Sequence, residues 1–144
     1  MTASQQVIRD LESVAAKFAE DVISRQKRRE LDPDDFEQLK GTGFLLTGVP
    51  AEQGGLWEGP AGSARVYSKM VRTIAHGDPS LALVASMHPA VTGFFLGVES
   101  VDDEPDAWRA QRQWVIDSAR DHWWGTVTSA VSYTHLTLPT IYSV

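Results

Sequence analysis

The sequence predicts a mostly α-helical domain, a short up-and-down bundle with one long glycine-rich loop, ending in a strand. Apolar residues recur at the 3.6-residue spacing of amphipathic helices along most of the chain. Six glycines and two prolines lie between residues 42 and 62, a density typical of tight turns. A run of aromatic and β-branched residues at 123–129 favours a strand. The length of 144 residues corresponds to one ordinary domain.

The composition is that of a globular protein, and it argues against several classes of function. Hydrophobic residues make up 42% and charged residues 22% of the chain, unlike a disordered protein. There are 19 acidic against 13 basic residues, a net charge of -6, so the positive surface of a nucleic-acid binder is missing. Cysteine is absent, which excludes disulfides, thiolate zinc sites and cysteine nucleophiles. Because no signal peptide is visible either, we expect a cytoplasmic protein.

One amphipathic helix is predicted at the N-terminus. Its polar end, residues 25–29, contains four basic side chains, and cations favour the negative end of a helix dipole. The dipole therefore explains this basic run without a nucleic acid or a partner, which is the alternative interpretation. The apolar face of the helix consists of Val7, Leu11, Val14, Ala15, Phe18 and Val22.

A short second helix is predicted from local capping signals. Asp32 followed by Pro33 is typical of an N-cap and the first helical position. The helix should continue through Lys40 and end at Gly41, since glycine adopts the left-handed conformation that terminates helices. The glycine-rich loop that follows is long enough for a functional role to be expected.

Two further helices are predicted on either side of a second capping signal. The first begins after Pro60 and ends at His76-Gly77; Asp78 and Pro79 then start an apolar segment, residues 80–96. This segment is hydrophobic on almost every side, so we expect a buried central helix rather than a membrane span. Pro89 lacks an amide donor and predicts a kink or break near Met87.

The C-terminal third is predicted to hold one more amphipathic helix before the strand at 123–129. A charged stretch, residues 99–106, precedes this helix. None of the four histidines lies close to carboxylates at metal-ligand spacing, so no metal site is expected. The helix has Trp108, Arg112, Val115, Ile116 and Ala119 along its length.

Residues 130–144 differ abruptly in composition from the rest of the chain. They carry no formal charge, whereas every Lys, Arg, Asp and Glu lies upstream. The run from Val131 to Thr140 resembles one reading frame of a transposon-based sequencing-library adapter. The alternative is a pair of edge strands around Pro139, since Tyr, Thr and Val favour strands. We treat 130–144 as a non-native tail, which implies that the authentic protein is interrupted after Ser129.

With this tail set aside, two segments of the chain carry recognisable motifs. The first is Val49-Pro-Ala-Glu-Gln-Gly-Gly-Leu56, preceded by Leu39-Lys-Gly-Thr-Gly-Phe-Leu45, and the second is Val71-Arg-Thr-Ile-Ala-His-Gly-Asp-Pro-Ser-Leu-Ala-Leu83. The first segment is similar to the Val-Pro-Glu-Glu-Tyr-Gly-Gly-Leu-Gly loop of the acyl-CoA dehydrogenase family, and the second resembles a helix junction of that family. The chain thus resembles the N-terminal helical domain of the acyl-CoA dehydrogenases. The resemblance implies a helical domain over 1–122 and the start of a truncated β-domain over 123–129.

The resemblance implies a fragment of a flavin-dependent oxidoreductase that dehydrogenates an acyl-CoA thioester, in a parent protein that is homo-oligomeric. Ser129 matches the Thr of a Thr-Glu-Pro motif beside the flavin, and Thr126 and Thr128 match neighbouring positions. FAD is the implied cofactor. The family's glutamate base lies in a later domain, so the fragment is expected to be inactive. Good strand formation alone also explains these three residues.

Two alternatives remain open. The same fold includes flavin-dependent monooxygenases that use a histidine near the flavin, with FMN as the alternative cofactor, and His88 is then the candidate catalytic residue. A lone histidine in an apolar helix is also typical of a core residue bonded to backbone. The second alternative is a helical interaction module with no enzymatic activity, which predicts a soluble monomer from residues 1–129.

Overall fold

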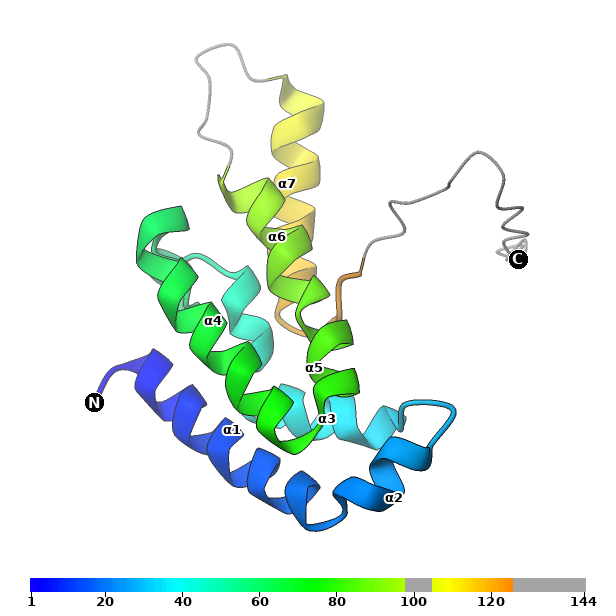
Figure 1. The fold of residues 1–144 in the computed structure, drawn as a ribbon. Coiled ribbons are helices and arrows are strands. Elements are labelled where there is room, and N and C mark those ends of the chain that lie inside the picture. The colour runs from blue at the N-terminus through cyan, green and yellow to red at the C-terminus, as the bar shows by residue number, and fades with distance from the viewer. Residues whose placement is uncertain (98–104, 126–144) are drawn as a thin grey trace, which may run out of the picture.

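The computed structural model describes residues 1–97 and 105–125, and this part of the chain is mostly helical (Figure 1). No strand occurs among these residues, apart from one isolated bridge between Pro50 and Trp57. The α-helices are α1 (Ala3–Glu20), α2 (Val22–Lys27), α3 (Pro33–Gly41), α4 (Gly59–Gly77), α5 (Pro79–Ala85), α6 (Met87–Gly97) and α7 (Asp106–Ala119). Two 3-10 helices, η1 (Phe44–Gly48) and η2 (Ala51–Gln53), lie between α3 and α4.

The long helices pack against one another in pairs. Helices α1 and α4 lie side by side, and α5 and α6 return along α4 in the opposite direction, with α7 behind α6 (Figure 1). Leu11, Met70, Ile74 and Leu81 occupy the main core between these helices and are almost completely buried. The expected up-and-down arrangement is therefore present in α4, α5–α6 and α7.

The approach of α1 to α4 depends on a glycine at the end of α4. A Cβ atom on Gly77 would lie 2.4 Å from the carbonyl oxygen of Ala15 and 2.8 Å from its Cα. Such distances are too short for carbon, so the two backbones can meet here only without a side chain. The glycine at the end of this predicted helix therefore has a packing role as well as a terminating one.

The N-terminal helix is interrupted, which corrects the expectation of a single helix. Asp21 separates α1 from α2, with φ -117° and ψ 26° outside the helical range. The predicted apolar face is confirmed for Val7, Leu11, Ala15 and Phe18, which are buried. Within the basic run, Lys27 lies exposed in the last turn of α2 as expected, whereas Arg25 departs from the prediction because its side chain is buried.

The predicted start of α3 is confirmed, whereas its end lies further along the chain. Asp32 caps the helix by accepting a 3.0 Å hydrogen bond from the amide of Asp34, with Pro33 in the first turn. Gly41 is still helical, and Gly43 is the residue with left-handed backbone, at φ 85°. Because both positions are glycine, the local sequence predicted the end of this helix two residues too early.

The glycine-rich segment is a compact structural element rather than an open loop. Phe44, Leu45, Val49 and Leu56 are buried, and the two 3-10 helices supply its turns. A Cβ on Gly55 would lie 2.0 Å from the carbonyl oxygen of Val49, so the chain can double back only with glycine at this position. The segment therefore contributes to the core.

The apolar segment after Asp78 breaks where the sequence predicts. Ser86 separates α5 from α6, one residue before Met87. Pro89 consequently lies in the first turn of α6, where the first amides lack intrahelical acceptors in any case. Asp78 caps α5, as expected, by accepting a 2.9 Å hydrogen bond from Leu81 N–H.

The expectation that this segment is buried on almost every side is wrong. Leu83 and Phe94 are 68% and 64% exposed, because no element of the described chain covers that side of α5 and α6. Pro79–Gly97 also has the length and apolar composition of a membrane-spanning helix, a property that core helices share.

The last described residues have no strand pairing. Trp123, Trp124 and Gly125 follow α7 in an irregular conformation. Residues 126–129, which complete the expected strand, lie outside the described residues, as does the tail at 130–144.

Candidate functional site

His88 lies at the centre of the candidate site and is completely buried. Its Nε2 is 2.9 Å from the carbonyl oxygen of Leu45 in η1, and its Nδ1 accepts a 3.1 Å hydrogen bond from the amide of Trp124. A carbonyl only accepts and a backbone amide only donates, so the hydrogen of the neutral ring belongs on Nε2. The imidazole therefore joins α6, η1 and the segment after α7.

The surroundings of His88 favour its neutral form. Burial lowers the pKa of the ring below its ordinary value, although the hydrogen bond to Leu45 acts in the opposite direction. Protonation of Nδ1 would also place a second donor against the amide of Trp124. With both nitrogens engaged, the described geometry is that of the core histidine that was the alternative to a catalytic role.

Aromatic rings surround this histidine on the side of the C-terminal segment. Trp123 packs edge-on against His88 and Phe36, with centroids 5.7 and 5.2 Å apart, and stacks on Phe44 at 5.8 Å. Its buried indole Nε1 has no hydrogen-bond acceptor among the described residues. A hollow of about 460 Å³ lies beside this cluster, lined mainly by apolar side chains that include Leu31, Phe36, Val84, Met87, Trp123 and Trp124.

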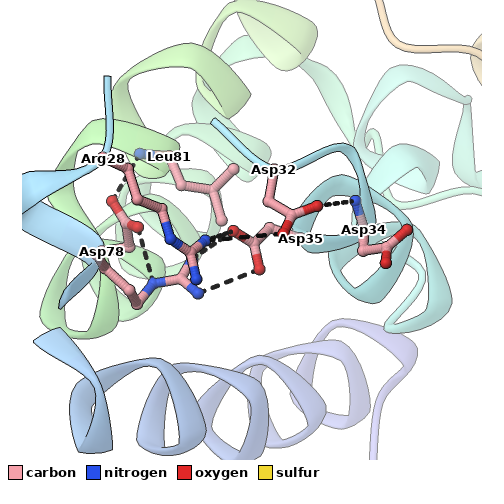
Figure 2. A network of polar contacts seen from close by, with 7 residues as sticks. Arg28, Asp32, Asp34, Asp35, Asp78 and Leu81 are labelled. Atoms are coloured by element: carbon pink, nitrogen blue, oxygen red, sulfur yellow. Dashed lines mark hydrogen bonds and ion pairs between the residues drawn. The ribbon is translucent and has the colours of Figure 1, made fainter. Parts of the chain in front are cut away.

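A second polar cluster is centred on Arg25 and joins three helices. The guanidinium donates to both carboxylate oxygens of Asp35 at 3.1 and 2.6 Å, and its Nε donates to Asp78 at 2.9 Å. Figure 2 shows these two carboxylates with Arg28, which adds a 3.2 Å contact to Asp35. Phe18 lies under the guanidinium, 3.9 Å from the ring centroid.

The electrostatics of this cluster are balanced. Burial alone would lower the pKa of Arg25, but the hydrogen bonds and charges of Asp35 and Asp78 raise that pKa above its ordinary value. Two basic side chains, Arg25 and Arg28, face two carboxylates, so the buried charges are compensated. The cluster fastens the α2–α3 connection to the start of α5, and within the described part of the chain it leaves no buried side-chain polar atom without a partner.

The sequence contained a signal for this cluster that the helix-dipole interpretation missed. Phe18, Val22 and Arg25 continue the helical spacing of the apolar face, so an arginine falls where an apolar residue is expected. A charge on an apolar face requires a partner, and Asp32, Asp34, Asp35 and Asp78 were all available at predicted helix starts. The sequence does not show which ones fold back onto Arg25.

The residues matched to flavin binding, Thr126, Thr128 and Ser129, lie outside the described residues. Within residues 1–97 and 105–125, His, Asp and Glu side chains form no group of three that could hold a metal ion. His88 is the only site candidate that the structure describes, and its two nitrogens are bonded within the chain. We therefore assign no step of flavin chemistry to the described residues.

Comparison of the chain with family models, with curated proteins and with solved structures gives no match in any of the three.

Proposed function

We propose that the chain is the N-terminal helical part of a flavin-dependent oxidoreductase resembling the acyl-CoA dehydrogenases, interrupted after Ser129. The observation that carries this proposal is the order and spacing of two motifs, Val49–Leu56 and Val71–Leu83, on one chain. In the family, FAD accepts a hydride from an acyl-CoA thioester while a glutamate of a later domain removes a proton.

The structure gives one glycine of each motif a packing role. Gly55 in the first motif allows the chain to pass against Val49, and Gly77 in the second allows α4 to approach α1. The helical content agrees with an N-terminal helical domain. In this proposal the described residues form a scaffold, and the flavin-facing side chains belong to the segment beginning at Thr126.

A non-enzymatic helical interaction module is the second candidate. The observation in its favour is that residues 1–97 and 105–125 close a core of their own, with Leu11, Phe44, Met70 and Leu81 almost fully buried. Both candidates make the same prediction for the described fold. They differ in what the gene encodes after Ser129.

The test is to sequence the source locus across the codon for Ser129 and to purify the protein that the complete reading frame encodes. The flavoenzyme proposal expects a continuation resembling Glu-Pro-Gly, a bound flavin visible in the absorption spectrum, and anaerobic bleaching of that flavin by an acyl-CoA. A flavin reduced by another donor and then oxidised by oxygen during substrate hydroxylation would identify the monooxygenase instead. A locus that encodes residues 130–144 and then stops would overturn the dehydrogenase and the monooxygenase assignments, and would leave the interaction module.

A further inference from the structure

Helix α4 is basic in an acidic protein. It contains none of the 19 acidic residues of the chain but carries Arg65, Lys69, Arg72 and His76. The intervals of four, three and four residues place these side chains on one helix face, along about 16 Å of the helix axis. All four side chains are exposed. The positive charge of α4 is therefore concentrated along one line of its surface.

These basic side chains border a groove between α4 and α1, which lie side by side (Figure 1). The groove has a volume of about 380 Å³, and α1 lines it with Glu12 and three alanines, whose short side chains do not fill the space. A second hollow, of about 370 Å³, shares Glu12 and Lys69 with the groove and adds Arg9. The α4 side of the groove is lined by Lys69, Arg72, Thr73 and His76.

The polar side chains of the groove have no partner among the described residues. Lys69, Arg72 and His76 make no hydrogen bond or ion pair with any residue of 1–97 or 105–125. The hydroxyl of Thr73 and the carboxylate of Glu12 are likewise without a partner in these ranges. The groove therefore presents several donors whose hydrogen bonds the described chain leaves unmade.

The acidic residues outside the described ranges adjoin the other end of α4. The tail at 126–144 has no Asp or Glu, whereas residues 99–104 include four acidic side chains. These follow Gly97, and a Cβ on Gly97 would lie 3.9 Å from the ring of Pro60 in the first turn of α4. Arg72 is about 18 Å further along the helix axis than Pro60. The free charge in the groove therefore calls for an anion from outside the chain.

We propose that this groove binds a small ligand with two or more linked phosphoryl groups. Its donors are an ammonium, a guanidinium, an imidazole and a hydroxyl, and phosphoryl groups offer these donors both negative charge and several acceptor oxygens. Glu12 can accept a hydrogen bond from a hydroxyl or amino group of the same ligand. The volume of the groove lies within the range of small-molecule sites.

The charge of the whole chain favours a small ligand over a large polyanion. A net charge of -6 repels a nucleic acid or an anionic membrane, which would extend well beyond the groove. A small ligand stays close to the basic side chains, and salt screens it from carboxylates more than about 8 Å away. This proposal does not depend on the flavoenzyme assignment.

Isothermal titration calorimetry of the full chain tests the groove, with ATP and inorganic tripolyphosphate as probes and no divalent metal present. We expect both to bind saturably, more weakly as the salt concentration rises, and adenosine not to bind. Tighter binding of ATP would identify a nucleotide as the ligand, and equal affinities would identify an inorganic polyphosphate. Either result supports the phosphoryl site.

Variants of the exposed cations locate the binding. Lys69→Gln should raise the dissociation constant of ATP by roughly fivefold, and Lys69→Gln combined with Arg72→Gln by roughly 30-fold, since each removes a charge-assisted hydrogen bond. Lys17→Gln is the matched control, because it removes the same charge from an exposed position of α1 outside the lining of the groove. Circular dichroism must show that all variants keep the helical content of the parent chain.

Three results would overturn the proposal: no saturable binding of either probe, adenosine binding as tightly as ATP, or equal losses for Lys69→Gln and Lys17→Gln. A single-stranded RNA that binds through Lys69 and Arg72 when neither probe does would assign the basic face of α4 to a nucleic acid, and would overturn it as well.

Discussion

Arg25 and Asp78 are 53 residues apart in the sequence, yet Nε of the arginine donates a 2.9 Å hydrogen bond to Oδ2 of the aspartate. The contact ties α2 to the first turn of α5. Both side chains are almost fully buried, at 5% and 8% exposure. Arg25 also holds Asp35 at the start of α3, so one guanidinium determines how three helices meet.

Arg25→Met is expected to destabilise the protein by about 3 kcal/mol, because it leaves two carboxylates buried with much less compensation. Arg28→Met is the matched control, and its effect should stay below about 1 kcal/mol, since the Arg28 side chain is 34% exposed. Urea unfolding followed by circular dichroism measures both. Equal losses for the two variants would show that the buried cluster is no more important than a surface ion pair.

Protonation of His88 should make the protein less stable in mild acid. The pKa of the ring is lowered in the folded state, whereas an unfolded histidine titrates near 6.5. Between these two values the unfolded chain binds more protons, so the stability supplied by this group is complete above pH 6.5 and is lost as pH falls towards the folded pKa.

The variant His88→Gln tests this dependence, since its amide nitrogen can still donate to Leu45. Its free energy of unfolding should be lower at neutral pH but should change less with acidification than that of the parent chain. His76→Gln is the control, because His76 is an exposed histidine and its replacement leaves His88, with the acid dependence that it causes, in place. If His88→Gln keeps the full acid dependence, other groups cause it.

Gly77→Ala should destabilise the protein by about 1–3 kcal/mol, the usual effect of overpacking. The added Cβ would meet the backbone of Ala15 and force α1 away from α4. Gly41→Ala is the comparison, since Gly41 is helical and has nothing within 4 Å of an added Cβ. That variant should gain about 0.5 kcal/mol from helix propensity. Thermal unfolding should therefore show a lower midpoint for Gly77→Ala and a higher midpoint for Gly41→Ala. An unchanged midpoint for Gly77→Ala would contradict the packing role of this glycine.

Tyr67→Phe should reduce stability by about 1 kcal/mol, because the phenol donates its hydrogen to the carbonyl of Thr47, a buried residue. Ser68→Ala removes an exposed hydroxyl on the neighbouring position of α4 and should change stability by less than about 0.5 kcal/mol. Denaturant titration of both variants makes the comparison. Unchanged stability of Tyr67→Phe would mean that water replaces the phenol as the hydrogen-bond donor to the Thr47 carbonyl.

Features controlled by neighbouring residues were predictable from the sequence. Asp32 and Asp78 begin helices as expected, and the break at Ser86 lies beside the position that Pro89 indicated. Whether Gly41 or Gly43 takes the left-handed conformation that ends α3 was not predictable, because glycine adopts it readily at either position. The two differ in their tertiary surroundings, since only Gly43 lies close to Val7.

Features that depend on distant parts of the chain could not be predicted. The partners of Arg25 lie 10 and 53 residues away, and His88 bonds to Leu45 and Trp124 across 43 and 36 residues. The exposure of Leu83 and Phe94 could not be predicted from the sequence either, because an apolar segment does not reveal which of its sides lacks a neighbour.

The two oxygens of Asp78 serve different parts of the molecule: Oδ1 accepts the amide hydrogen of Leu81, and Oδ2 accepts that of Arg25 Nε. The first turn of α5 and the docking of α2 therefore share one side chain and become coupled. Hydrogen–deuterium exchange at the Leu81 amide should report on the attachment of α2, although the two are far apart in sequence. A local helix cap thus provides a spectroscopic reporter of tertiary structure.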